Sequence, residues 1–206
     1  MDAVRVLQQG VLFAHVVAFA VALSAVLHED IAILKARRVD AERLATAART
    51  LSVALLALWA SGLALVVCDI GLDVQALLAR PKLAAKLVVV TALTANGLAL
   101  HALALPVLRR LPVDAGPGAG TPPMLPLILG AVSTASWLYA SFIGVSRLIA
   151  PWMRLADFLL IYAALLAGAI AVALLVVRPR MAVASAATAA SSASAATAAR
   201  GSIQGT

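Results

Sequence analysis

The chain has 206 residues, of which 64% are hydrophobic and only 12% are charged. Its mean hydropathy of +1.04 is far above that of soluble globular proteins, which indicates that lipid surrounds most of the chain. The formal net charge is +7, but the sixteen lysines and arginines lie mostly in short segments beside the apolar runs. Because they form no contiguous basic face, membrane topology explains them, and we expect no nucleic-acid partner.

Five apolar runs account for most of the sequence, and each reaches or approaches the length that a helix needs to cross a bilayer. They cover residues 11–27, 51–68, 83–108, 125–150 and 158–177. The first run is longer than the apolar core of a usual signal peptide, and few basic residues precede it, so we expect it to remain as a span. The sequence therefore predicts an all-α fold, a polytopic membrane bundle of five transmembrane helices that forms one domain over residues 1–180.

The charges between the first two spans predict the orientation of the bundle. We expect residues 28–50 to form a helical extension that leaves the bilayer, and this segment contains five basic residues between positions 35 and 49. Basic residues beside spans mark the cytoplasmic side. The numbers of basic residues in the later loops, summed over alternate loops, favour the same orientation. The N-terminus is therefore expected outside and the C-terminus inside, with the lipid bilayer as the main partner.

Two segments are predicted to be irregular. Residues 111–124 contain several prolines and glycines, which do not continue a helix. Residues 181–206 are a low-complexity stretch of Ala, Ser and Thr with almost no charge, so they cannot bury a core. We predict a turn-rich connector between the third and fourth spans and a disordered tail after the fifth.

Ionisable residues inside the spans are the candidates for function, because burying a charge in a bilayer is costly. With the N-terminus outside, His15, Lys86 and Arg147 fall at the outer level and His101 falls near the inner face. We predict these four residues as a cofactor-binding set. Helical rise puts His15 and His101 about 20 Å apart along the membrane normal, so they cannot share one metal or one haem iron.

The third span carries a polar stripe, because Lys86, Thr94, Gly97 and His101 fall within an arc of about 80° at 100° per residue. One interpretation is that the stripe lines a cleft for a cofactor or substrate. The alternative is that Lys86 reaches the membrane surface and that the other polar groups bond within the protein. Asn96 points elsewhere, and we expect it to join two helices by a hydrogen bond.

The sequence also offers candidate metal ligands near the inner face. His28 and Glu29 precede Asp30, and His101 could be the third ligand of the same metal ion. Consecutive residues on a helix point about 100° apart, so His28 and Glu29 would need His101 as a partner to bind one ion. A solvated cluster at the end of a helix is the alternative. The single cysteine, Cys68, excludes an internal disulfide and a cysteine-based zinc site.

The fourth span is rich in serine, and its Ser136, Ala140 and Gly144 follow the spacing of small residues that lets helices approach closely. We therefore predict helix packing along this face. The span contains no nucleophile motif such as G-x-S-x-G, so the sequence gives a hydrolase no support.

Three stretches resemble a group of small bacterial multi-helix membrane proteins. They are FAHVVAFAVALSAVLHEDIAILKARR at residues 13–38, LWASGLALVV at residues 58–67 and RPKLAAKLVVVTALTANGLALH at residues 80–101. The group includes the copper-resistance D type and the haem-associated membrane protoporphyrinogen oxidases. In the latter, a histidine on the first helix and a lysine near the start of the third matter for function, and the resemblance implies His15 and Lys86 for these positions.

The resemblance covers residues 10–108, about half of the chain. It implies a multi-pass protein of a bacterial inner membrane and haem b as the candidate cofactor. Our first functional hypothesis is an accessory or structural membrane protein. The alternatives are a haem- or metal-associated redox protein and a small transporter component. A second copy of the chain or another membrane subunit is an expected partner in each case.

Overall fold

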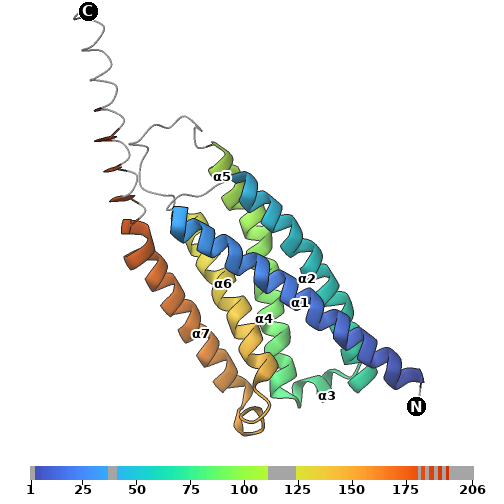
Figure 1. Cartoon of the computed structure of the whole chain (residues 1–206). Helices are drawn as coiled ribbons and strands as arrows, with labels where there is room; N and C mark the ends of the chain where they lie inside the picture. The colour runs from blue at the N-terminus through green and yellow to red at the C-terminus, as the bar shows by residue number, and fades with distance from the viewer. Residues whose placement is uncertain are drawn as a thin grey trace, which may run out of the picture.

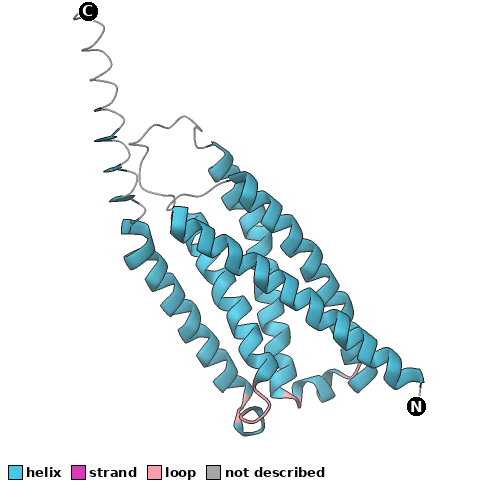
Figure 2. Cartoon of the chain, viewed as in Figure 1, coloured by secondary structure: helices cyan, strands magenta, loops and turns pink. Residues whose placement is uncertain are grey.

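The computed structural model describes residues 3–36, 41–110 and 124–180, together with residues 182, 183, 186, 187, 190, 191 and 194. In this part of the chain the regular structure is helical and no strand occurs (Figure 2). The prediction of an all-α fold is therefore confirmed. The predicted connector, apart from its last residue, and most of the predicted tail lie outside the described residues.

Seven α-helices and three short turns of other helix types follow one another along the described chain (Figure 1). The α-helices are α1 (Ala3–Ala36), α2 (Ala41–Ile70), α3 (Val74–Leu78), α4 (Pro81–Ala99), α5 (Leu105–Arg110), α6 (Met124–Val145) and α7 (Leu155–Val172). The other turns are the π-helical η1 (Leu100–Ala104) and η3 (Ala173–Val177) and the 3₁₀-helical η2 (Ala150–Trp152).

Five of these helical stretches are long and apolar enough to cross a membrane, as the sequence predicts. They are Ala3–Ala32, Ala45–Ile70, Pro81–Val107, Met124–Val145 and Leu155–Arg180. The fourth ends five residues before the predicted end at Ala150. There the chain turns through residues 146–149 into η2, whose second residue is Pro151, and a proline is poorly compatible with the inside of a helix.

A tight connection joins α2 to α4. Gly71 adopts a positive φ of 67° just after α2, a conformation that glycine reaches without steric cost. Asp73 then caps α3, because its carboxylate accepts hydrogen bonds from the backbone N–H groups of Gln75 and Ala76. Pro81 occupies the first turn of α4, where its missing N–H costs no hydrogen bond.

Two π-helical turns interrupt the third and fifth spans, and each lies just before a proline. The turn η1 precedes Pro106 and the turn η3 precedes Pro179. A proline has no N–H, and its ring collides with the carbonyl group four residues earlier, so a wider turn at this place relieves the collision. His101 lies within η1, and Pro106 therefore gives its unusual backbone a local cause.

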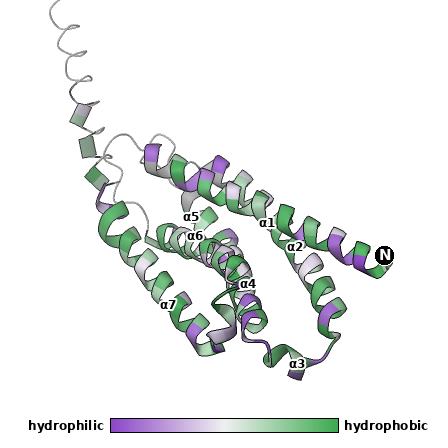
Figure 3. Cartoon of the chain, turned by 60° about the horizontal axis from the view of Figure 1, so that its bottom comes forward, coloured by the Kyte–Doolittle hydropathy of each residue, from purple (hydrophilic) through white to green (hydrophobic). Residues whose placement is uncertain are grey.

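The helices form a bundle with two parts (Figure 1). The helices α1 and α2 pack mainly against each other, whereas α4, α6 and α7 form the rest of the bundle. The N-terminal end of α1 lies at the same end of the bundle as α3, as do the start of α4 and the end of α6. We call this end the α3 end. Hydrophobic residues predominate along the spans, and hydrophilic residues are more frequent towards the helix ends (Figure 3).

The core lies where α4, α6 and α7 meet. Its largest fully buried side chains include Tyr139, Phe158 and Ile143. The ring of Tyr139 stacks on that of Tyr162 with the centroids 5.1 Å apart. The first part of the bundle joins this core through Phe19 of α1, whose ring lies 5.6 Å from that of Trp137.

Hydrogen bonds between helices support this packing. Asn96 donates from Nδ2 to the carbonyl of Leu129 at 3.1 Å, so the expected role of Asn96 is confirmed. The hydroxyl groups of Ser136 and Tyr162 lie 2.7 Å apart. The small-residue face of α6 behaves as predicted at the buried Ser136 but not at Gly144, where an added Cβ would meet no atom within 4 Å.

Replacing Asn96 by alanine is expected to lower the free energy of unfolding by about 0.6 kcal/mol, the average for a hydrogen bond between membrane helices, and by no more than about 1.7 kcal/mol. The reason is that the carbonyl of Leu129 loses its donor from α4. The measurement is unfolding in mixed micelles with increasing dodecyl sulfate, followed by circular dichroism. Thr50→Ala is the control, because the Thr50 hydroxyl bonds only to its own helix. Equal losses in both variants would contradict the prediction.

Candidate functional site

His15 of α1 is held by α2. Its Nδ1 atom lies 2.8 Å from the hydroxyl oxygen of Ser61. Next to this contact, the ring passes Gly62, where an added Cβ would lie 3.4 Å from Cε1 of His15. A Cβ at this distance would be in ordinary van der Waals contact with the ring, so the half-buried His15 lies close against α2 at Gly62.

The proton on His15 can be assigned from the bonds of Ser61. The hydroxyl of Ser61 donates to the carbonyl of Ala57 at 2.6 Å, and a hydroxyl has only one proton to donate. Ser61 must therefore accept from His15, so that Nδ1 carries the proton. Among the described residues no partner is found for Nε2 of His15, whose lone pair is left for a ligand.

Several basic side chains between His15 and the α3 end act on one another electrostatically. The charge of Lys86 acts on His15, and Lys82 one helical turn earlier acts on Lys86. Arg147 lies just after α6 and repels Lys82 electrostatically. We call Lys82, Lys86 and Arg147 the cationic cluster. Of the predicted cofactor-binding residues, Lys86 thus acts electrostatically on His15, and Arg147 acts on Lys82, a residue that the sequence analysis did not single out.

The described acidic residues near this end bond to other groups. Asp69 pairs with Arg80. Asp157 accepts a hydrogen bond from the backbone N–H of Arg154 at 2.7 Å. In the described part of the chain, the three members of the cationic cluster form no hydrogen bond and no ion pair, so their charge is not neutralised within the protein.

His101 lies far from this region, because fifteen residues of helix separate it from Lys86, a rise of about 22 Å. Its Nε2 atom lies 3.3 Å from the hydroxyl of Ser52 on α2. Ser52 donates to the carbonyl of Ala48, so His101 is the donor here by the same argument as for His15. His101 is therefore not part of the site around His15.

The predicted polar stripe of α4 faces α2 through two of its members. Besides the contact of His101, the Thr94 hydroxyl accepts a hydrogen bond of 2.9 Å from Nε1 of Trp59. The cavity beside His101 measures only about 60 Å³ and lies between α2, α4 and α6. Thr94 and His101 bond to the neighbouring helix, which favours the packing interpretation for this part of the stripe over a path for a substrate.

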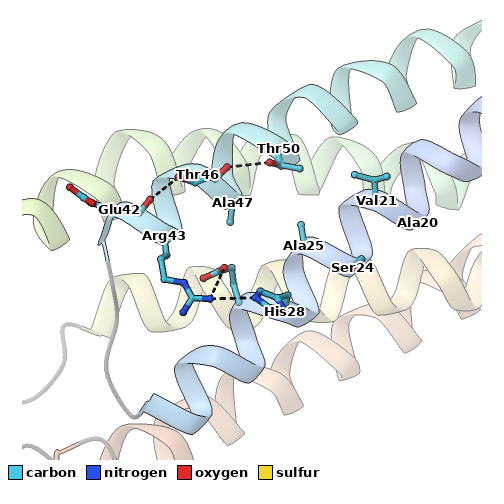
Figure 4. A pocket seen from close by; sticks show the side chains of 11 residues that line it. Ala20, Val21, Ser24, Ala25, His28, Glu42, Arg43, Thr46, Ala47 and Thr50 are labelled. Atoms are coloured by element: carbon cyan, nitrogen blue, oxygen red, sulfur yellow. Dashed lines mark hydrogen bonds and ion pairs between the residues drawn. The ribbon is translucent and has the colours of Figure 1, made fainter.

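A larger groove runs between α1 and α2 at the other end of the bundle from α3 (Figure 4). It has a volume of about 860 Å³. Small side chains line most of it, and Arg43 reaches across one end to His28 and Glu29 (Figure 4). Arg43 donates to Nε2 of His28 at 3.3 Å and lies 3.8 Å from a carboxylate oxygen of Glu29.

This arrangement does not assemble the predicted metal set. The Nε2 lone pair of His28 accepts from a guanidinium group, which would repel a cation at the same place. His28 and His101 line different cavities. Among the described residues, no three His, Cys, Asp or Glu side chains lie close enough to hold one metal ion, so the structure does not bring His28, Glu29 and His101 together.

Two partners were missed by the sequence analysis. Ser61 carries no signal of its own, because a serine in an apolar run is expected to bond back to its own helix. Asp30 accepts a hydrogen bond of 2.7 Å from the Thr134 hydroxyl of α6, which joins α1 to the rest of the bundle. Its position at the end of an apolar run was visible in the sequence, but its partner lies 104 residues away.

Comparison with protein-family models, with curated proteins and with solved structures finds no match for this chain. The resemblance to the haem-associated group of membrane proteins therefore stays a prediction.

Proposed function

We propose that this integral membrane protein binds haem b, with Nε2 of His15 as an axial ligand and the cationic side chain of Lys86 near a haem propionate. The observation that carries the proposal is the hydrogen bond between His15 and Ser61. It holds the proton on Nδ1 and leaves the lone pair on Nε2, which is the state that an iron ligand requires.

The surroundings of His15 also suit this ligand. Haem iron in many proteins is held by a histidine whose other ring nitrogen donates a hydrogen bond, which orients the ring and raises its basicity. Propionates are anionic carboxylates, and the positive charge of Lys86 acts on His15. Bound haem would supply one-electron redox chemistry, while the protein would supply the ligand, its orientation and the compensating charge.

A second candidate is an accessory membrane protein without a cofactor of its own. It is favoured because many polar side chains within the spans bond inside the protein, as Thr94, Asn96 and Ser136 do. Such a bundle would act through a partner membrane subunit or through a second copy of the chain. In either case, the proposed location is a bacterial inner membrane, with the α3 end and the N-terminus outside.

The deciding experiment is an absorption spectrum of protein purified in detergent from haem-replete cells, recorded oxidised and after reduction with dithionite. Haem binding predicts a Soret band that shifts on reduction, together with about one iron per chain. A colourless preparation that also fails to take up added haemin would refute the haem proposal. It would leave the accessory bundle as the better account.

A further inference from the structure

The turn between α6 and α7 exposes large apolar side chains at the α3 end. Leu148 is 89% exposed and Trp152 is 87% exposed, although both lie beside a well-packed core. In the protein alone, such exposure is unfavourable. A tryptophan next to the end of a membrane span is typical of the interface between lipid headgroups and acyl chains. The turn is thus placed where headgroups meet the protein.

The cationic cluster adjoins this turn. Arg147 directly precedes Leu148, and Lys82 opens α4, which runs antiparallel to α6 and packs against it. Figure 1 shows the start of α4 and the end of α6 side by side at the α3 end. Lys82 and Arg147 repel each other, and among the described residues neither has an acidic partner. An anion placed between two like charges would relieve their repulsion.

We propose that Lys82 and Arg147 bind the phosphate of an anionic phospholipid, while Leu148 and Trp152 contact its acyl chains near the headgroup. The occupant is a lipid rather than a soluble anion, because exposed apolar side chains directly follow Arg147 at the membrane interface. The site is distinct from the haem proposal, since it uses neither His15 nor its ligand nitrogen.

The test measures lipid preference by native mass spectrometry of the full chain in detergent, with equal amounts of phosphatidylglycerol and phosphatidylcholine. The parent protein is expected to retain the anionic lipid preferentially. A cation that contacts the bound headgroup contributes about five-fold, so Lys82→Gln together with Arg147→Gln is expected to lower the preference by about 25-fold. Each single variant is measured as well and should lose about five-fold. Circular dichroism checks that each variant remains folded, and the single variants keep the test valid if the double variant unfolds.

Arg180→Gln is the matched control, because it removes the same charge from an exposed position at the other end of the fifth span, Leu155–Arg180. It should leave the preference unchanged. Equal losses in Arg180→Gln and Arg147→Gln, or no preference in the parent protein, would overturn the proposal. Inorganic phosphate that displaces phosphatidylglycerol at millimolar concentration would also overturn it, in favour of a site for a soluble anion. His15→Ala should keep the lipid preference, so the haem and lipid proposals can fail separately.

Discussion

Replacement of His15 by alanine is expected to abolish the Soret band while the bundle stays folded. The variant removes Nε2 of His15, whose lone pair has no partner among the described residues and on which the charge of Lys86 acts. Because His15 is only half-buried, its loss leaves a small defect at the surface between α1 and α2. The measurement is the absorption spectrum after haemin titration, with helical content checked by circular dichroism.

The matched control is His101→Ala, which removes a histidine that also forms a hydrogen bond with a serine of α2. If His15 is the ligand, His101→Ala should keep the Soret band. Loss of the band in both variants, or in His101→Ala alone, would contradict the assignment of His15. Ser61→Ala tests the orientation separately, because loss of a partner that orients a ligating histidine weakens binding by about 10-fold to 100-fold without abolishing it.

The sequence predicts the five spans well because their signal is local. A run of apolar residues long enough to cross a bilayer needs no knowledge of its neighbours, since the helix satisfies its own backbone hydrogen bonds. The end of α6 was misplaced because residues 146–150 remain mostly apolar, although the helix already ends at Val145. The signal for that end was Pro151, which favours a break shortly before it.

The candidate site was only partly predictable, because it depends on which helices pack together. Helical rise places His15 and Lys86 at a similar depth, but depth alone does not bring α1 and α4 close. Nothing local marks Ser61 as the partner of His15 rather than another serine of the spans. The predicted metal set failed to assemble for the same reason: His28 and Glu29 turn towards Arg43 of α2, whereas His101 turns towards a different cavity.

The polar stripe of α4 shows the limit of helical periodicity. Periodicity correctly groups Thr94 and His101 on one face, and both contact α2. It cannot say whether that face borders a cleft or a neighbouring helix. Membrane spans make this distinction especially hard, because a polar group inside the bilayer needs a partner in either situation.

Replacement of Phe158 by alanine is expected to destabilise the bundle by about 3–5 kcal/mol, the usual cost of removing a buried phenylalanine side chain. Phe158 is fully buried at the start of α7, and its backbone carbonyl accepts a hydrogen bond from the hydroxyl of Tyr139. Its side chain belongs to the cluster that joins α7 to α4 and α6. A cavity at this place would remove contacts from several helices at once.

Phe13→Ala makes the same chemical change on a side chain that is 72% exposed on α1, and it serves as the control. In detergent its side chain contacts mainly surfactant, so its loss should change the free energy of unfolding by less than about 0.5 kcal/mol. Both variants are compared by dodecyl sulfate unfolding in mixed micelles. Similar losses for the two variants would mean that the α4, α6 and α7 cluster does not hold the bundle together. A selective loss for Phe158→Ala would place the stability of the protein in this cluster, separate from the more exposed region around His15.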